Sequence, residues 1–313
     1  MQNIKAVQER QEDMITLAVR KPALITRFAG VLGGYDKANQ FLASLVSAVN
    51  GNTSLQRCDV LKLIGCAMQA ASLNLDINPN LGFASIVPYK NKDGEQIPQF
   101  QIGWKGFVQL AMRTGKYRTM NVTEVYKDEF DSFDPFKGEL RYHNVTDGDR
   151  DNDRRENIVG YAFYFELVSG YSKMAYMSKE SITAHAKRHS KAYRNDLKND
   201  SHDSLWSTEE GFDAMAKKTI TKLTLSKWGV LSTQMIVATK TDQGTMNIND
   251  FDDGGNARKV DYIDNNDKPE TAEPKAKAKQ IEASQEKSAP KAKADDAEMP
   301  AVTDSDDLGG VSF

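Results

Sequence analysis

Residues 99–118 read QFQIGWKGFVQLAMRTGKYR, and this stretch decides the fold class. A strand-like run meets a glycine and passes into a helix-like run, Trp104–Thr114. Upstream, the strand-like runs Phe83–Tyr89 and Phe100–Gly103 flank a loop at Asn91–Gln96 that contains Asp-Gly, a frequent hairpin signal. The stretch therefore predicts a strand hairpin followed directly by a helix.

The regions on both sides are predicted to add helices and further strands. Apolar residues recur at helical spacing over residues 1–75. Three later runs are rich in β-branched or aromatic residues and predict strands: Arg118–Tyr126, Ile158–Val168 and Lys173–Met177. Two further helices are expected at Ser178–Lys198 and Thr208–Trp228. The pattern predicts an α+β fold, with a small antiparallel sheet and its hairpin packed between an N-terminal helical region and C-terminal helices.

The composition is typical of a globular protein that buries a core and has a largely solvated surface. It has 313 residues, 39% of them hydrophobic, and a mean hydropathy of −0.58. No run approaches the roughly 18 apolar residues of a membrane span, and the charged first residues lack the apolar core of a signal peptide. Cys58 and Cys66 suggest neither a disulfide framework nor a metal knuckle. We therefore expect a cytoplasmic protein without a membrane partner.

Charge is distributed unevenly along the chain. Residues 251–313 carry 9 Lys and Arg against 15 Asp and Glu, whereas residues 173–227 carry 11 basic against 7 acidic side chains. From about Asn247 onward, Asp, Asn, Gly, Lys, Ala, Glu and Pro dominate, a composition with little to bury. We expect a mildly basic folded region at 1–247 that could bind a polyanion, followed by a disordered acidic tail at 248–313.

The Gly-Lys pair of the opening stretch does not form a phosphate loop. The P-loop motif G-x-x-x-x-G-K-[ST] requires Gly at position 110 and Ser or Thr at 117, where this chain has Leu and Tyr. Gly115 ends the predicted helix, a common place for glycine. We expect no ATP-driven activity and no cofactor, with Mg²⁺ at most modulating the activity.

Basic residues form three stripes at helical spacing. The first consists of Lys105, Gln109 and Arg113, and Lys116 and Arg118 extend it past the helix end. The other two stripes consist of Lys187, Lys191, Arg194 and Lys198, and of Lys217, Lys218, Lys222 and Lys227. Each stripe alone is also compatible with an ordinary solvated helix face. Together they predict a groove lined by cations, which would bind a polyanion through its phosphates.

Aromatic residues lie next to these cations in the sequence. Tyr89 precedes Lys90, Trp104 precedes Lys105, and Trp206 precedes the last helix. Tyr117, flanked by Lys116 and Arg118, is the aromatic residue best placed to stack on a nucleotide base. The alternative is that these rings pack in the core or at its edge.

Two metal-site patterns are incomplete. His185 and His189 have the spacing of a helical zinc pair, but the residues between them are Ala, Lys and Arg rather than a general base. DRDND at 149–153 resembles the start of a calcium loop, yet Arg154 and Gly160 stand where Gly and Glu are required. The other carboxylates cluster in loops without a motif that would gather Mg²⁺, so a nuclease is the less favoured hypothesis.

Four sequence blocks, in order from Ser72 to Trp228, resemble the RecT family of phage single-strand annealing proteins. The blocks are SLNLDINPNLGFASIVPYKN, QFQIGWKGFVQLAMRTGKY, VGYAFYFEL and FDAMAKKTITKLTLSKW. The resemblance implies an ATP-independent recombinase that coats single-stranded DNA as rings or helical filaments and pairs complementary strands. Residues 1–247 would then be the region that binds DNA, anneals it and oligomerises. It also implies that the protein binds the annealed duplex intermediate, acts with a phage 5′→3′ exonuclease and meets the host single-strand-binding protein on the DNA.

By the same resemblance, eleven positions are expected to contact the DNA backbone. They are Lys90, Lys105, Arg113, Lys116, Arg118, Lys187, Lys191, Arg194, Lys217, Lys218 and Lys222. Gln109 and Tyr117 complete the candidate set derived from the stripes and the aromatics.

Two alternatives to annealing and one role for the tail stay open. The chain could be a metal-dependent nuclease of a phage recombination module, or a single-strand coat protein that does not anneal. The last residues, DSDDLGGVSF, resemble the acidic, Phe-ended tips of bacterial single-strand-binding proteins. They would compete with DNA for the basic groove or dock on replication proteins; the alternative is a tail that only aids solubility.

Overall fold

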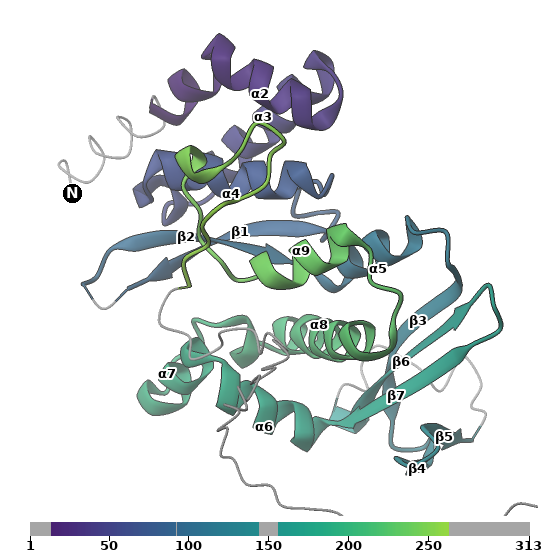
Figure 1. The fold of residues 1–313 in the computed structure, drawn as a ribbon. Coiled ribbons are helices and arrows are strands. Elements are labelled where there is room, and N and C mark those ends of the chain that lie inside the picture. The colour runs from purple at the N-terminus through teal and green to yellow at the C-terminus, as the bar shows by residue number, and fades with distance from the viewer. Residues whose placement is uncertain (1–13, 92, 144–155, 263–313) are drawn as a thin grey trace, which may run out of the picture. The chain divides into compact units, whose positions relative to one another are not determined.

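The N-terminal part of the chain is helical. The computed structural model describes residues 14–91, 93–143 and 156–262 (Figure 1). Helix α2 (Pro22–Leu32) begins with a proline, whose missing N–H is unneeded there, and ends at Gly33 in the left-handed region with φ of 76°. Helix α3 (Tyr35–Asn50) follows, then the 3₁₀ turn η1 (Leu55–Arg57). The rings of Phe28 and Phe41 lie 5.9 Å apart and join α2 to α3.

Helix α4 (Val60–Ser72) forms the centre of the N-terminal core. Its residues 63–71 are all buried, and the Asp59 carboxylate caps its start by accepting the Lys62 N–H. At Gly65, a Cβ atom would lie 2.1 Å from the carbonyl oxygen of Met246, so only glycine allows the chain to pass this close. Helix α4 is thus covered by segments on both sides and carries few polar residues.

The opening stretch of the sequence folds as predicted, into a hairpin followed by a helix. Strands β1 (Ala84–Lys90) and β2 (Gln96–Ile102) pair antiparallel, and α5 (Trp104–Met112) begins two residues later. A Cβ at Gly103 or Gly106 would lie about 2 Å from the carbonyl oxygens of Gly82 and Phe83 respectively. The two glycines therefore let the first turn of α5 lie directly against the start of the hairpin.

A second antiparallel sheet carries the C-terminal helices. Its strands are β3 (Tyr117–Tyr126), β6 (Ile158–Leu167) and β7 (Ser172–Ser178), with β6 in the middle. The long helix α8 (Glu209–Trp228) packs on the face formed by Tyr161, Phe163 and Phe165 of β6 (Figure 1). The Tyr161 hydroxyl donates a hydrogen bond to the Asp213 carboxylate of α8. Burial, followed by this hydrogen bond, raises the pKa of Tyr161 far above its ordinary value.

The structure divides one predicted helix into two. The run expected as a single helix at Ser178–Lys198 forms α6 (Lys179–His189) and α7 (Lys191–Asn199). Ser190 between them has an extended conformation, with φ of −105° and ψ of 111°, and its hydroxyl accepts the Tyr193 N–H as an N-cap. The serine hydroxyl thus stabilises a new helix start where the pattern of residues alone predicts continuity.

Some elements were not anticipated from the sequence. Strands β4 (Phe130–Asp134) and β5 (Glu139–Tyr142) form a hairpin between the predicted strands Arg118–Tyr126 and Ile158–Val168, where no element was predicted. The rings of Phe130 and Phe133 lie 5.0 and 5.5 Å from that of Tyr176 on β7, which holds the hairpin against the sheet. The turn η4 (Leu205–Ser207) precedes α8, and the short helix α9 (Thr233–Thr241) follows it.

The predicted boundary after residue 247 is too early. The turn η5 (Ile248–Asp250) and Phe251 pack on the core, with Ile248 and Phe251 buried. The guanidinium of Arg27 on α2 donates to the carbonyl oxygens of Ile248 (3.1 Å) and Phe251 (2.7 Å). Residues 248–262 are therefore part of the folded region, because two apolar side chains and one arginine anchor an otherwise polar segment. The remainder of the predicted tail lies outside the described residues.

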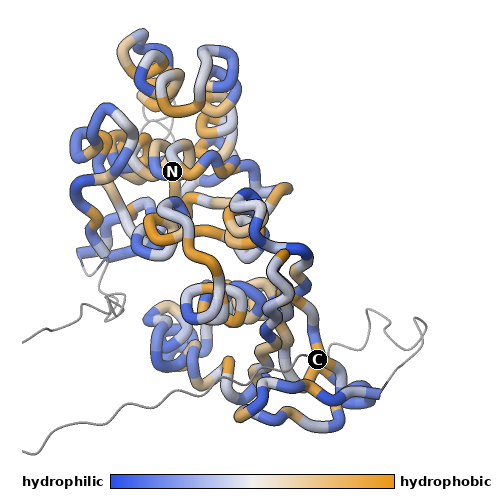
Figure 2. The backbone as a smooth tube through the Cα atoms, turned by 45° about the vertical axis from the view of Figure 1, so that its right-hand side comes forward, coloured by the Kyte–Doolittle hydropathy of each residue, from blue (hydrophilic) through white to orange (hydrophobic). Residues whose placement is uncertain are grey.

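The observed fold confirms the predicted α+β class, with helices before and after small antiparallel sheets. Along the helices, hydrophobic and hydrophilic residues alternate (Figure 2), as expected for helices with one buried face. Among the described residues, none of the helices combines the length and the apolar composition needed to cross a bilayer.

Candidate nucleic-acid interface

Cations from two helices that are far apart in the sequence meet at the ring of Trp104. The Lys105 Nζ lies 5.8 Å from the centroid of this half-buried ring, and the Nζ of Lys217 on α8 lies 5.9 Å from it. The packing of α5 against α8 brings the two lysines together. We call these three residues the Trp104 surface. An aromatic face flanked by two ammonium groups can stack on a base while it holds phosphates.

One carboxylate shares the Trp104 surface. Lys217 forms an ion pair with Glu124 of β3, and both side chains are partly exposed. The exposed Lys105 side chain lies along Gly82, with its Cδ atom 3.6 Å from the position that a Cβ there would take. While Glu124 pairs with Lys217, the surface therefore carries one net positive charge. An anion that displaces the Glu124 carboxylate would meet both ammonium groups.

The next lysine of α8 is buried and faces away from this surface. The Lys218 Nζ donates to the Asp242 carboxylate at 2.9 Å, and the Lys222 Nζ donates to its second oxygen at 2.8 Å. The backbone N–H of Ile102 also donates to Asp242 at 2.9 Å. The prediction that Lys218 contacts DNA is therefore wrong: its side chain is only 7% exposed. Lys222 is partly exposed but is held by the same carboxylate.

In the buried cluster of Lys218, Lys222 and Asp242, the two lysines keep the Asp242 carboxyl ionised. Burial alone would raise the pKa of the Asp242 carboxyl, but the two ammonium groups lower it to about 2. Desolvation lowers the pKa of Lys218, and the charge of Asp242 opposes this shift. The cluster connects α8 to β2 and to the end of α9. It positions the helix that carries Lys217 rather than binding a ligand.

Tyr117, predicted as the stacking aromatic, is also buried. Its ring packs edge-on against Phe165 with the centroids 5.5 Å apart, and it is 5% exposed. The hydroxyl accepts a hydrogen bond from the Val230 N–H at 2.7 Å and donates to the Val230 carbonyl at 3.3 Å. Tyr117 therefore supports the loop after α8 and offers no face to a base. The cations on both sides of it in the sequence point outward because alternate residues of a strand face opposite sides.

The first basic stripe has a structural member at its end. Lys105 is exposed and Gln109 is half-buried, whereas the Arg113 guanidinium donates to the carbonyl oxygens of Leu73 (2.9 Å) and Asn74 (2.8 Å). These carbonyls follow the last turn of α4, where helical partners are missing. Arg113 therefore joins the end of α5 to the end of α4.

The remaining cations of this region are exposed. Lys116 leads into β3, and Lys90 ends β1 opposite Gln96 in the hairpin. Arg118 forms an ion pair at 2.6 Å with Glu166 on the neighbouring strand β6, while its own side chain stays 60% exposed. Lys90, Lys116 and Arg118 thus remain candidates for DNA contact.

The second predicted stripe is not continuous. Lys187 belongs to α6, whereas Lys191, Arg194 and Lys198 belong to α7 beyond the break at Ser190. The Arg194 guanidinium donates to the carbonyl oxygens of Lys187 (3.0 Å) and Arg188 (2.6 Å), so it caps the end of α6. Lys187 is exposed and Lys191 half-buried, and Lys187 no longer shares a helix with Lys191 and the rest of the stripe.

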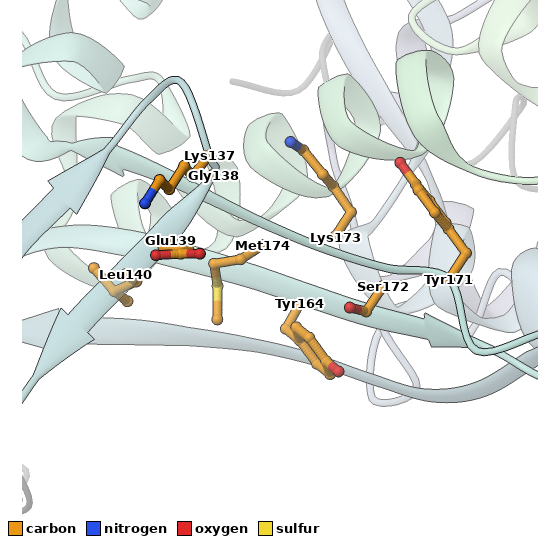
Figure 3. Close-up of a pocket in the computed structure, with 9 residues that line it drawn as sticks. All are labelled: Lys137, Gly138, Glu139, Leu140, Tyr164, Tyr171, Ser172, Lys173 and Met174. Carbon is orange, nitrogen blue, oxygen red and sulfur yellow. The ribbon is translucent and has the colours of Figure 1, made fainter.

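A shallow pocket of about 490 Å³ lies between the β4–β5 hairpin and the turn of β6 and β7. Two lysines, Lys137 and Lys173, line it together with Glu139 and Tyr164 (Figure 3). In the same view, Lys173 and Tyr171 project to one side of β7 and Met174 to the other. Among the described residues that line it, no nucleophile is paired with a general base, so this part of the lining does not suggest a catalytic site.

Within the described residues, no group of three or more His, Cys, Asp or Glu side chains is arranged to hold a metal ion. His185 and His189 lie side by side with their ring centroids 4.4 Å apart, as their spacing predicts. The calcium-like DRDND run at 149–153 lies outside the described residues. The sequence missed Glu124 and Asp242, because nothing in the local pattern distinguishes these acids from solvated ones.

Lysines around a partly exposed aromatic ring are a feature of proteins that bind nucleic acid along the backbone. Comparison with known proteins identifies the class: a sequence profile described as the RecT family matches residues 39–253. The chain belongs to the RecT family, whose members are DNA-binding proteins that anneal single strands in recombination.

Two curated relatives support this assignment. "Uncharacterized protein YqaK" of Bacillus subtilis (strain 168) is 37% identical over 257 residues, which cover 82% of this chain and 81% of the relative. "Protein RecT" of Escherichia coli (strain K12) is 25% identical over 125 residues, or 39% of this chain and 46% of that protein. The family profile ends at residue 253, so the assignment rests on the helices and sheets rather than on the acidic end of the chain.

Proposed function

We propose that the protein binds single-stranded DNA at the Trp104 surface and pairs complementary strands without ATP. The observation that supports this most directly is that the ammonium groups of Lys105 and Lys217, from two different helices, both lie within 6 Å of one partly exposed tryptophan ring. Phosphates of one strand would take the two ammonium groups, and a base would stack on Trp104. Phosphate contacts hold the strand without reading its sequence and leave the pairing edges of other bases free.

Annealing by this route requires no chemical step. Base pairing supplies the free energy, and the lysines reduce the repulsion between two phosphate backbones. Several copies of the chain, arranged along the DNA as a ring or filament, would extend the Trp104 surface into a continuous track. We further propose that an exonuclease supplies the single strands and that a host single-strand-binding protein occupies the same DNA.

Binding is tested by the anisotropy of a labelled oligonucleotide at several salt concentrations. We expect the double variant Lys105→Ala and Lys217→Ala to lower the salt slope by about two units, one for each phosphate that the variant no longer neutralises. Lys198→Ala, which removes an exposed lysine of α7, is the matched control and should change the slope least. An unchanged slope in the double variant would place the DNA on another face.

Glu124→Gln provides a test with the opposite sign. Removing the carboxylate that pairs with Lys217 frees an ammonium group for phosphate, so we expect binding at low salt to tighten by up to about fivefold. Weaker binding in this variant would contradict the proposed exchange of partners.

Annealing is measured with two complementary oligonucleotides that carry a fluorophore and a quencher. The proposed annealer speeds their pairing, whereas a coat protein that does not anneal slows it. Parallel incubation of a labelled single strand with Mg²⁺ distinguishes the nuclease, which would shorten the strand. Electron microscopy after sequential addition of the two oligonucleotides tests the oligomer.

A further inference from the structure

A second exposed cluster of large side chains lies at the end of α8. It comprises Trp228 (51% exposed), Leu231 (41%), Tyr171 (44%) and Val168 (58%), with Val230 beside them. The Lys173 Nζ lies 4.6 Å from the centroid of the Trp228 ring. We call these six residues the Trp228 surface. None of them belongs to the Trp104 surface.

Hydrogen bonds and ring contacts hold the parts of this surface together. The buried Tyr117 hydroxyl binds both backbone groups of Val230, and the Val168 N–H donates to the Lys116 carbonyl at 2.9 Å. The Tyr171 ring lies 6.1 Å from that of Phe165, against which Tyr117 also packs. The loop after α8 and the turn between β6 and β7 are therefore fixed to the same buried aromatic pair.

Among the described residues, lysines outnumber carboxylates at the Trp228 surface, where Glu139 lines the same pocket as Tyr171 and Lys173. Lys173 projects from β7 to the same side as Tyr171 (Figure 3), and the exposed Lys227 precedes Trp228 in α8. The nearest carboxylate along β6, that of Glu166, is paired with Arg118. The surface thus combines aliphatic groups, two aromatic rings and two ammonium groups.

We propose that the Trp228 surface binds an acidic peptide segment of a partner protein, with apolar side chains between its carboxylates. Leucine or phenylalanine side chains of the peptide would cover Trp228 and Leu231, and its carboxylates would pair with Lys173 and Lys227. Exposed apolar side chains rimmed by charge are characteristic of protein interaction sites.

Two other occupants fit less well. Single-stranded DNA could stack on Trp228 and Tyr171, but half of the surface, namely Val168, Val230 and Leu231, is aliphatic and offers a base no aromatic face. The Trp104 surface has no such aliphatic part. A two-fold contact with a second copy would bring lysines of like charge toward each other, which opposes association. A head-to-tail contact would place the surface against a different face of the next copy, and the measurement of oligomer size described below tests for it. An acidic, apolar peptide satisfies both the aliphatic and the cationic groups.

The test uses the full chain and a labelled ten-residue peptide, DLSDFGDLSG, as a probe of this chemistry, because it has apolar side chains between its carboxylates and differs from the chain's own last residues, DSDDLGGVSF. Fluorescence anisotropy should show saturable binding that weakens with salt. We expect Trp228→Ala to weaken binding of the probe at least fivefold, and we expect the same of the double variant Lys173→Ala and Lys227→Ala. Leu197→Ala on α7 is the matched control, since Leu197 is 54% exposed and lies outside the surface. A probe with its three Asp replaced by Asn should bind weakly.

Three results would overturn the proposal. The first is equal probe binding by the chain and by Trp228→Ala. The second is a loss of oligonucleotide binding in Trp228→Ala as large as the loss of probe binding, because the surface would then bind DNA. The third is a change of oligomer size in Trp228→Ala by sedimentation, because the surface would then join copies of the chain. Leu231→Ala repeats each measurement if Trp228→Ala fails to fold. Failure at the Trp104 surface leaves all three results unaffected.

Discussion

Lys217 and Lys218 are neighbours in the sequence, yet the two faces of α8 give them opposite environments. Lys217 lies beside the Trp104 ring with a partly exposed ion pair, whereas Lys218 is buried against Asp242. A phosphate can reach the first ammonium group but not the second. The difference shows that a cluster of lysines in a sequence does not by itself define a cationic surface: the carboxylate that packs against each lysine decides its role.

The largest expected effect concerns the buried side of α8. Asp242→Asn removes the charge that compensates Lys218 and Lys222, and breaking a buried ion pair in this way costs about 3–5 kcal/mol. Urea denaturation should show this loss in the free energy of unfolding. Asp261→Asn is the control, because Asp261 forms an exposed pair with Lys259 at 3.2 Å. A loss below about 1 kcal/mol for Asp242→Asn would remove the contrast between the two lysines.

Acid should weaken the same cluster in the chain without substitutions. The folded pKa of Asp242 is about 2, below the value of about 3.9 in an unfolded chain. The ionised carboxylate therefore stabilises the fold at and above pH 4, and this contribution, on the order of 2 kcal/mol, disappears as the pH falls from 4 to 2. Urea denaturation at several pH values measures the decrease, and Asp242→Asn should show less of it.

Arg113 extends the comparison to the first basic stripe. Arg113→Ala removes two hydrogen bonds to the carbonyls after α4, and we expect a loss of about 1 kcal/mol in the free energy of unfolding, as is typical of such bonds. Arg113→Lys should recover only part of it, because an ammonium group lacks the fork that binds both carbonyls. If Arg113→Ala instead leaves the free energy of unfolding unchanged and lowers the salt slope of DNA binding, Arg113 binds a DNA phosphate, as proposed for Lys217.

The smallest effect on stability is expected at Lys217 itself. Lys217→Ala breaks a partly exposed ion pair, so the free energy of unfolding should change by less than about 1 kcal/mol. The salt slope for oligonucleotide binding should nevertheless fall by about one unit. The two measurements together distinguish a surface lysine from Lys218, for which the order of the effects is reversed.

Most secondary structure could be predicted from the sequence because the local signals agree with the fold. The hairpin, α5 and α8 lie within a few residues of their predicted positions, and Gly115 adopts the left-handed conformation expected at a helix end, with φ of 66°. The break at Ser190 and the β4–β5 hairpin were missed. The Ser190 hydroxyl caps the second helix and so causes the break, and contacts with Tyr176 stabilise the hairpin.

The candidate site was predicted less completely. The sequence pointed to Lys105 and Lys217 as candidates for DNA contact, and to Trp104 as the aromatic residue next to Lys105. The burial of Tyr117 and Lys218 was not predicted. Each side chain is buried against a partner far along the chain, more than a hundred residues away for Tyr117 and 24 residues away for Lys218.

The sequence by itself determined the α+β class, the family and the absence of a phosphate loop, because these depend on residues close together in the chain. Only the tertiary structure decided which cations reach solvent. Packing of α8 against β2, β3 and α5 assigns one carboxylate to Lys218 and Lys222 and another to Lys217. That assignment depends on distances in space, which spacing along a helix does not contain.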